Sequence, residues 1–337
     1  MKEKTAIAVI GAGRIGKIHI ENINNHIKDY YVKWLIEPAH KEMLQLIEEM
    51  GIPHVSDKLQ PALDDKEVKA ILICSSGDTH LDFIKQAARQ KKAIFCEKPL
   101  GLDVAKTKEA IKVAKDNKVL LQVGFNRRFD GEFSALKKKI KEIGSLQMIK
   151  ITSRDPAPPP HEYIKRSGGI FLDMSIHDFD MVRFLSDSEV VEVSVMADCL
   201  VDPKLKKYDD VDTALISLKL KNGAMALIDN CRKAVYGYDQ RIELFGSKGM
   251  LIASNRQESL VETFNEQGKK GEKLLYFFLE RYSNSFITEM KSFFASVANP
   301  KLGVAVSGED GLKPLVIGLA AKKSLKEKRI VRLEEIG

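Results

Sequence analysis

Short apolar runs alternate with helix-like stretches in the first third of the chain. The strand-like runs are residues 5–10, 32–36, 70–74, 93–96 and 119–124, with a further short run near 54–55. Helix-like stretches follow Gly16 and cover residues 39–50, 80–90 and 103–116. Strands that are apolar throughout and separated by helices are typical of a parallel sheet with helices on both faces. The pattern therefore predicts an N-terminal doubly wound (Rossmann) domain over residues 1–125.

Beyond Gly124 the pattern changes to longer strands with turns between them. The predicted elements are a helix at 130–143, strands at 146–154, 190–197, 212–220, 224–231, 240–245 and 249–252, and helices at 282–297 and 308–327. Asn222-Gly223 is a strong signal for a β-hairpin. Residues 126–337 are therefore predicted to form an α+β domain with a large, mainly antiparallel sheet.

A glycine-rich turn stands between the first strand and the first helix, at Gly11-Ala-Gly13-Arg14-Ile15-Gly16. This motif is weak evidence by itself, but a strand before it and a helix after it are the context that dinucleotide binding requires. Glu37 ends the second strand, 21 residues after Gly16, where a carboxylate binds ribose hydroxyls and disfavours a 2′-phosphate. The sequence thus predicts NAD. His40 and Lys41 follow closely and could accommodate a phosphate, which leaves the strictness of that preference open.

Further polar residues follow the carboxyl ends of the later strands, where ligands of doubly wound sheets bind. Ser75, His80 and Glu97 are candidate cofactor-binding residues on this rim, together with Lys98. Pro99 disfavours a helical conformation at Lys98, so a sharp turn is expected there. An ammonium group at this point can polarise an alcohol or ketone oxygen, although a surface lysine at a strand end is the common alternative.

The segment from Ser167 to Asp180 places a carboxylate and an imidazole in a mostly apolar stretch. Interpreted as the start of a helix, it puts Asp173 and His177 four residues apart, on one face. A satisfied buried Asp–His pair is one interpretation. The other is catalytic: a dehydrogenase needs a hydride acceptor, a base and a group that stabilises alkoxide charge. NAD, His177 and Lys98 would fill these roles, with Asp173 beside His177.

Composition excludes several classes of function. The chain has 337 residues, 44% hydrophobic and 30% charged, which suits a globular protein with two cores. Its net charge of +7 comes from dispersed lysines, so no nucleic-acid partner is predicted. No apolar run is long enough for a bilayer, and the N-terminus lacks the pattern of a signal peptide. Four cysteines without metal-ligand spacing predict no metal site and a cytoplasmic location.

Four segments together resemble a known family. They are Ala8–Gly16, Cys96-Glu-Lys-Pro-Leu100, Gly124-Phe-Asn-Arg-Arg-Phe-Asp130 and Gly168–Asp178. The chain resembles the glucose–fructose oxidoreductase/inositol dehydrogenase/rhizopine catabolism (Gfo/Idh/MocA) family over nearly its whole length, and within it the bacterial inositol 2-dehydrogenases. Segments 154–160, 228–249 and 310–324 carry the similarity to that group.

The resemblance implies that Lys98, Asp173 and His177 are catalytic, that Arg128, Asp155 and Tyr236 lie near a polyol, and that the protein is a homotetramer built by stacking the large sheets. It implies NAD-dependent oxidation of myo-inositol to 2-keto-myo-inositol (scyllo-inosose). Glu37 departs from the aspartate that NAD-preferring members often carry. Two alternatives stay open: a sugar or other polyol dehydrogenase on the same scaffold, and a non-catalytic nucleotide-binding regulator.

Overall fold

The computed structural model describes residues 4–337, without the side chain of His40. These residues form two compact units. Unit 1 contains the chain up to Phe129 together with Asn284–Leu315, and unit 2 contains Asp130–Ser283 and Val316–Gly337. The domain boundary at 125/126 stays a prediction from the sequence, and the compact units add a late segment, Asn284–Leu315, to the N-terminal part.

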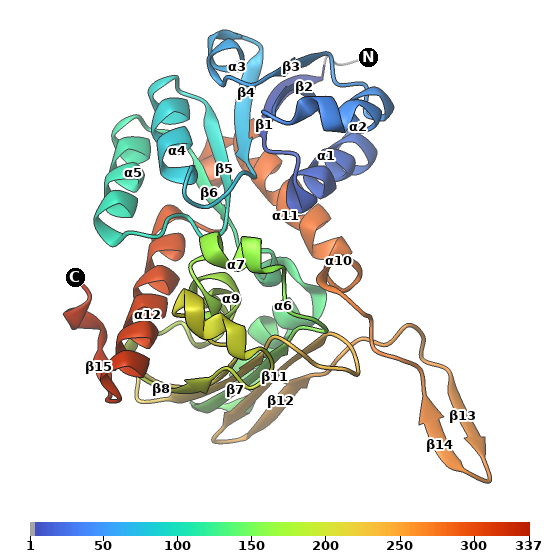
Figure 1. Cartoon of the computed structure of the whole chain (residues 1–337), viewed down its shortest axis with the longest axis vertical. Coiled ribbons are helices and arrows are strands. Elements are labelled where there is room, and N and C mark those ends of the chain that lie inside the picture. The colour runs from blue at the N-terminus through green and yellow to red at the C-terminus, as the bar shows by residue number, and fades with distance from the viewer. Residues whose placement is uncertain (1–3) are drawn as a thin grey trace. The chain divides into compact units, whose positions relative to one another are not determined.

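Unit 1 is built on a six-stranded parallel sheet in the order β3-β2-β1-β4-β5-β6. Its strands are β1 (Thr5–Ile10), β2 (Tyr30–Ile36), β3 (His54–Ser56), β4 (Val68–Ile73), β5 (Ala93–Glu97) and β6 (Leu121–Gly124). Its helices are α1 (Arg14–His26), α2 (Leu44–Glu49), α3 (Gln60–Asp64), α4 (His80–Arg89), α5 (Val104–Asp116) and most of α11 (Ser283–Ala298). The predicted doubly wound parallel fold is confirmed (Figure 1).

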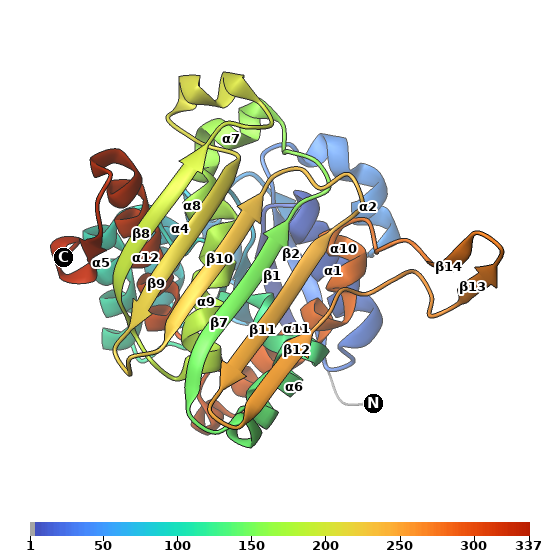
Figure 2. The ribbon, with the colours of Figure 1, turned by 90° about the horizontal axis from the view of Figure 1, so that it is seen from below.

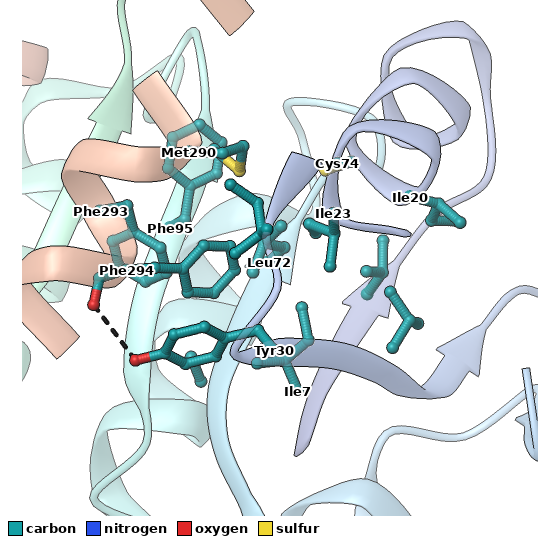
Figure 3. Packing of buried hydrophobic residues seen from close by; sticks show 14 of the residues in the cluster. Ile7, Ile20, Ile23, Tyr30, Leu72, Cys74, Phe95, Met290, Phe293 and Phe294 are labelled. Carbon is teal, nitrogen blue, oxygen red and sulfur yellow. Dashed lines mark hydrogen bonds between the residues drawn. The ribbon is translucent and has the colours of Figure 1, made fainter. Parts of the chain in front are cut away.

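Helix α11 belongs to the core of unit 1 although it lies far along the chain. Met290, Phe293 and Phe294 pack against the strands, and the hydroxyl of Tyr30 donates to the carbonyl of Phe294 at 3.1 Å (Figure 3). The rings of Tyr30 and Phe294 are stacked with centroids 4.2 Å apart. Apolar side chains of α11 therefore complete a core that the N-terminal sequence does not fill alone.

Unit 2 contains a seven-stranded sheet in the order β12-β11-β7-β10-β9-β8-β15, seen face-on in Figure 2. Its strands are β7 (Leu146–Arg154), β8 (Val190–Asp198), β9 (Thr213–Leu220), β10 (Met225–Cys231), β11 (Asp239–Gly246), β12 (Gly249–Ala253) and β15 (Val331–Arg332). Neighbouring strands are antiparallel except β7 and β10, which confirms the mainly antiparallel sheet. The Asn222-Gly223 turn joins β9 to β10 as predicted, and Gly223 has φ +93°.

The helices of unit 2 are α6 (Gly131–Lys139), α7 (His161–Ser167), α8 (Ile170–Asp173), α9 (Ser175–Ser186) and α10 (Phe278–Arg281), and α12 (Gly308–Glu327) runs from unit 1 into unit 2. Of these, α6 packs against β12, and α9 packs against β7 and β10. A separate hairpin, β13 (Glu262–Asn265) and β14 (Gly268–Gly271), projects from the sheet edge at β12 (Figure 2). None of the helices among the described residues has the length and apolar character that crossing a membrane requires.

Several local predictions are wrong. The expected helix at 39–50 is a 3-10 turn at His40–Met43 followed by α2, and α3, α7 and the β13–β14 hairpin are additional. The helix expected to carry Asp173 and His177 is interrupted at Met174, whose φ and ψ are −98° and −60°. These two residues therefore do not share the face of one regular helix. Helices α8 and α9 each make their own tertiary contacts, α8 with Asp210 and α9 with Asn230.

Candidate active site

The glycine-rich turn has a different steric requirement at each glycine. Gly11 has φ +89°, and a Cβ there would lie 2.9 Å from the Cys74 carbonyl. A Cβ on Gly16 would lie 2.0 Å from the oxygen of Gly11, whereas one on Gly13 would meet nothing within 4 Å. The first and third glycines thus allow close packing, and the second leaves open space at the N-terminus of α1. This arrangement fits a pyrophosphate bound by backbone N–H groups.

Glu37 folds back onto this turn from the end of β2. Its Oε2 accepts a hydrogen bond from the amide of Ala12 at 2.8 Å, and its Oε1 accepts one from the amide of Ala39 at 3.0 Å. The structure therefore brings the predicted ribose-binding carboxylate to the glycine-rich turn. Arg14 begins α1, whose first turn holds no acidic residue that would repel a phosphate. The side chain of His40 lies outside the described residues, and Lys41 is exposed.

Ser75 and His80 connect two turns at the carboxyl end of the sheet. The hydroxyl of Ser75 shares a 2.7 Å hydrogen bond with Thr79. The ring nitrogens of His80 lie 3.0 Å from the Ser75 carbonyl and 2.8 Å from the Pro99 carbonyl. Burial lowers the pKa of His80. In these contacts His80 links the turn after β4 to the turn after Lys98, and a direct contact of His80 with the cofactor stays a prediction.

Glu97 ends β5, Lys98 follows it, and a cis peptide bond joins Lys98 to Pro99. The Glu97 carboxylate is buried, with Oε1 2.7 Å from His19 Nε2 and Oε2 3.3 Å from the Lys98 amide. The side chain of Glu97 is therefore directed into unit 1. A contact of Glu97 with the cofactor stays a prediction.

Arg128 lies in a 3-10 turn after β6 and pairs with a residue of α12 in the same unit. Its Nη2 donates to Asp310 at 3.0 Å. Burial opposes ionisation of Asp310, but the charge of Arg128 and the hydrogen bonds from Ser307 outweigh it and lower the pKa of Asp310. The structure thus places the predicted polyol-binding arginine in an ion pair.

In unit 2, Asp173 is held by two residues that the sequence analysis did not select. Tyr163 donates to Oδ1 at 2.8 Å, and Nη1 of Arg232 donates to Oδ2 at 3.3 Å. Arg232 is 1% exposed. Burial lowers the pKa of Arg232, but Asp173 and Asp210 outweigh it and raise the pKa. The carboxylate of Asp173 is therefore oriented by a buried, permanently charged guanidinium.

The start of α8 fixes the backbone before Asp173. Gly169 has φ +81°, and a Cβ there would lie 2.7 Å from Oδ1 of Asp210. The same oxygen accepts a hydrogen bond from the amide of Ile170 at 2.8 Å. Asp210 thus binds the N-terminus of α8 and faces Arg232, with Oδ2 3.8 Å from Nη2.

Helix α9, which carries His177, is attached to the sheet by buried polar groups. Asn230 on β10 accepts from the hydroxyl of Ser175 at 2.5 Å and donates to Asp178 at 2.8 Å. Ser153 on β7 donates to the other oxygen of Asp178 at 2.6 Å. Such satisfied networks restrict the position of an element within the core. His177 itself is half-buried in the first turn of α9.

Asp155 and Tyr236 belong to two adjoining loops beside Arg232. The amide of Asp155 donates to the carbonyl of Cys231 at 2.9 Å, and the amide of Ala234 donates to the carbonyl of Asp155 at 2.6 Å. The hydroxyl of Tyr236 accepts from Arg154 at 3.0 Å and donates to Asp239 at 2.7 Å. The loops that carry these two predicted substrate residues are thus joined by backbone hydrogen bonds.

Tyr163, Asp210 and Arg232 were missed because no sequence spacing relates them to Asp173. Arg232 is the one with a usable signal, since it stands in the 228–249 segment that carries the resemblance. Unit 1 thus holds the predicted cofactor residues and Lys98, and unit 2 holds Asp173, His177, Asp155 and Tyr236.

Comparisons with known proteins find similarity over nearly the whole chain. Residues 5–125 match the oxidoreductase family with an NAD-binding Rossmann fold, and residues 133–252 match the GFO/IDH/MocA C-terminal domain. Myo-inositol 2-dehydrogenase of Thermotoga maritima is 48% identical over 98% of this chain and 99% of its own. The crystal structure of a probable dehydrogenase from Thermotoga maritima has a TM-score of 0.95 at 47% identity, over 98% of this chain and 100% of that one. That of scyllo-inositol dehydrogenase from Lactobacillus casei, with NAD(H) and scyllo-inositol bound, has a TM-score of 0.91 at 30% identity, over 98% and 100%.

Proposed function

Because the chain belongs to the GFO/IDH/MocA family of oxidoreductases, whose N-terminal domain is an NAD-binding Rossmann fold, we propose that it oxidises a ring hydroxyl of a cyclitol with NAD. The proposed reaction is myo-inositol to 2-keto-myo-inositol (scyllo-inosose). The observation that carries this proposal is the 48% identity to a myo-inositol 2-dehydrogenase over 98% of this chain. An alignment over 98% of this chain covers both the nucleotide turn and the Asp173/His177 segment.

The residues of the glycine-rich turn fit NAD. Open space beside Gly13 admits the pyrophosphate to the free N–H groups of α1, and Glu37 stands at the same turn to accept ribose hydroxyls. NAD, when bound, accepts the hydride that leaves the substrate carbon. Removal of the hydroxyl proton and stabilisation of the negative charge on the oxygen fall to side chains of the protein.

Three side chains carry the proposed chemistry. His177 takes the proton of the reacting hydroxyl, while the carbon loses a hydride and its C–O bond becomes a carbonyl. The ammonium group of Lys98 stabilises the negative charge that develops on that oxygen. Asp173 accepts hydrogen bonds from Tyr163 and Arg232, which fix its carboxylate, and it is the acceptor group proposed beside His177. A binding module would not need a base, so this set favours an enzyme over a regulator.

The proposed substrate is a neutral polyol. Asp155, Tyr236 and Arg128 are hydrogen-bonding groups of mixed charge, and Arg128 is already paired with Asp310. This leaves little excess positive charge for a phosphate or carboxylate. A site built for hydroxyls rejects analogues that lack one, because buried polar groups then stay unpaired.

We also propose a homotetramer in the cytoplasm. Support for the assembly is the apolar outer face of the large sheet, where Met148, Met225 and Phe245 are 42–50% exposed. Support for the location is that all four cysteines are free thiols.

Turnover with a substrate panel tests the function. Purified protein is assayed with NAD and NADP against myo-inositol, scyllo-inositol, glucose and an inositol phosphate. We expect the highest kcat/KM with NAD and a free cyclitol. Greatest efficiency with glucose would replace the proposal by a sugar dehydrogenase, and no turnover of any cyclitol would reject it.

Two variants test the assigned roles. His177→Ala is expected to lower kcat by about 10²–10⁴-fold, the usual contribution of a positioned general base. Lys98→Ala should lose a similar factor, and both should bind NADH as the parent does in a fluorescence titration. Near-normal turnover in either variant would remove that residue from the mechanism.

A further inference from the structure

A buried cluster of three titratable side chains lies inside unit 1, behind the chain segment that carries Lys98. His19 comes from α1, Glu97 from the end of β5 and Glu289 from α11. One nitrogen or oxygen atom from each of them lies within 4.8 Å of the other two. Their exposed fractions are 0%, 7% and 0%. The rings of Phe95 and Phe286 meet the His19 ring edge-on, with centroids 5.2 and 5.8 Å away, so the surroundings are apolar.

The two carboxyl groups of this cluster have unequal partners. Glu97 lies 2.7 Å from His19 Nε2 and accepts from the Lys98 amide at 3.3 Å. Within residues 4–337, no group donates a hydrogen bond to either oxygen of Glu289. A Cβ on Gly124 would come within 3.0 Å of the Glu97 carboxyl, so that group is also confined sterically. The Glu97 carboxylate therefore has hydrogen-bond partners in the buried cluster. Glu289 has none among the described residues, so the free-energy cost of burying its carboxyl group must be reduced in another way.

Two adjacent carboxylates in such a place would repel each other strongly. The other titratable groups that face them are His19, Cys74 on the chain after β4, Cys96 on β5 and, toward Glu97, His80. Burial, and then the charge of Glu97, raise the pKa of Glu289 well above its ordinary value. A proton on Glu289 removes the second negative charge from the cluster and turns the Glu289 carboxyl group into a hydrogen-bond donor.

We propose that Glu289 is a positioning residue for Lys98: as the neutral carboxylic acid it keeps the Glu97 carboxylate on His19 and on the Lys98 amide, and so fixes the end of β5. The assignment rests on the proposed function in one respect, the catalytic role of Lys98. It links α11, which arrives from the distant C-terminal part of the sequence, to the chain position at which the ammonium group begins.

The protonation state has a consequence for stability. An unfolded chain ionises Glu289 above about pH 4.5, whereas the folded chain keeps the proton. Stability from this group is thus fully present below that pH and is lost as the pH rises toward the folded pKa. Over this window the unfolding equilibrium constant of the parent, divided by that of Glu289→Gln, should rise by up to about tenfold per pH unit.

The test combines urea unfolding with kinetics on the full chain. Glu289→Gln keeps the shape and a donor but cannot ionise, Glu289→Leu fills the space without a donor, and exposed Glu309→Gln is the matched control. The quantity compared is the unfolding equilibrium constant of the parent divided by that of the variant. Between pH 5 and 7 we expect this ratio to rise for Glu289→Gln and to stay constant for Glu309→Gln. A flat ratio for Glu289→Gln would show that Glu289 is ionised in the folded protein and would overturn the proposal.

The kinetic arm separates positioning from a merely structural role. Glu289→Leu should lose kcat by about 10–100-fold with unchanged KM for NAD, as expected for a displaced catalytic group. Glu289→Gln should keep kcat within about twofold of the parent, which is rescue by the conservative variant. Parent-like kcat in a folded Glu289→Leu would reject the positioning role.

Two further outcomes are distinguishable. Absence of cyclitol turnover in the parent would reject the proposed function, while the unfolding ratio would still decide whether Glu289 is neutral. A stoichiometric divalent ion found by elemental analysis, and lost in Glu289→Gln, would overturn the neutral-acid assignment in favour of a metal.

Discussion

At the scale of single residues, Glu37 has two functions at once. Its carboxylate is the proposed discriminator against a 2′-phosphate, and it also accepts hydrogen bonds from the amides of Ala12 and Ala39. Replacing it by serine would remove both contacts and disturb the glycine-rich turn. A substitution of the same size is therefore the better probe of cofactor preference.

Glu37→Gln is expected to raise the NADP to NAD ratio of kcat/KM by about 10-fold or more, because the charge that repels the 2′-phosphate is removed while one acceptor remains. Turnover with NAD should stay within a few-fold of the parent. The measurement is steady-state kinetics with both cofactors. A parent that already prefers NADP would contradict the role given to Glu37.

Arg232 is a residue of unit 2 whose loss should cost much stability. It is buried between Asp173 and Asp210, so Arg232→Met would leave two carboxylates without their cation. We expect the free energy of unfolding to fall by about 3–5 kcal/mol, measured by urea denaturation. The control is Arg329→Ala, which removes a solvent-exposed pair with Glu335 and should leave stability nearly unchanged. Equal effects of the two substitutions would contradict the cost assigned here to buried carboxylates that lose their cation.

At the scale of elements, the positions of α8 and α9 matter more than their helical character. The start of α8 depends on Gly169 and Asp210, and α9 depends on the buried Asp178–Asn230 contact. The interruption at Met174 allows each piece to satisfy its own contacts. The geometry of Asp173 and His177 is thus set by attachment to the sheet.

Gly169→Ala tests this dependence. The added Cβ would lie 2.7 Å from Asp210, on a residue with φ +81°, so α8 must move. We expect a stability loss of about 1–3 kcal/mol and a kcat lowered by about 10-fold or more. Gly51→Ala is the matched control, because Gly51 has φ +61° but nothing within 4 Å. It should lose stability through backbone strain and keep kcat. Unaltered kcat in Gly169→Ala would separate α8 from the active site.

At the scale of the molecule, the outer face of the large sheet is unusually apolar for a surface. Met250, Phe245, Met148 and Met225 are register neighbours across β12, β11, β7 and β10, and each is 42–50% exposed. Phe264, on the separate β13–β14 hairpin, is also exposed, at 70%. Contiguous apolar surface of this kind marks an interface between proteins.

The pair Met148→Lys and Phe245→Lys is therefore expected to convert the proposed tetramer into smaller species, because charges would be buried at the stacked sheets. Light scattering after size-exclusion chromatography measures the mass. Leu44→Lys, at a 64% exposed position of unit 1, is the control and should keep the parent mass. A tetramer that survives the double substitution would locate the interface elsewhere.

The sequence by itself determined the elements with strong local signals. The alternation of apolar runs and helices fixes the parallel sheet of unit 1, and Asn222-Gly223 fixes the β9–β10 turn, because periodicity and turn chemistry act over a few residues. The family expected from the sequence is confirmed as well. It was recognisable because each motif that carries the resemblance is a continuous run of residues. The predicted strand at 146–154 and helix at 308–327 have those bounds in the structure.

Only the tertiary structure decided which partners these elements give to the functional residues. Arg232 reaches Asp173 across 59 positions of sequence, and Glu289 reaches Glu97 from a helix that joins unit 1 late in the chain. Glu97 is a predicted cofactor residue, and only the structure shows that its carboxylate lies 2.7 Å from His19. Neither pattern nor spacing records such contacts, because their free energy depends on burial and on charges that packing brings together.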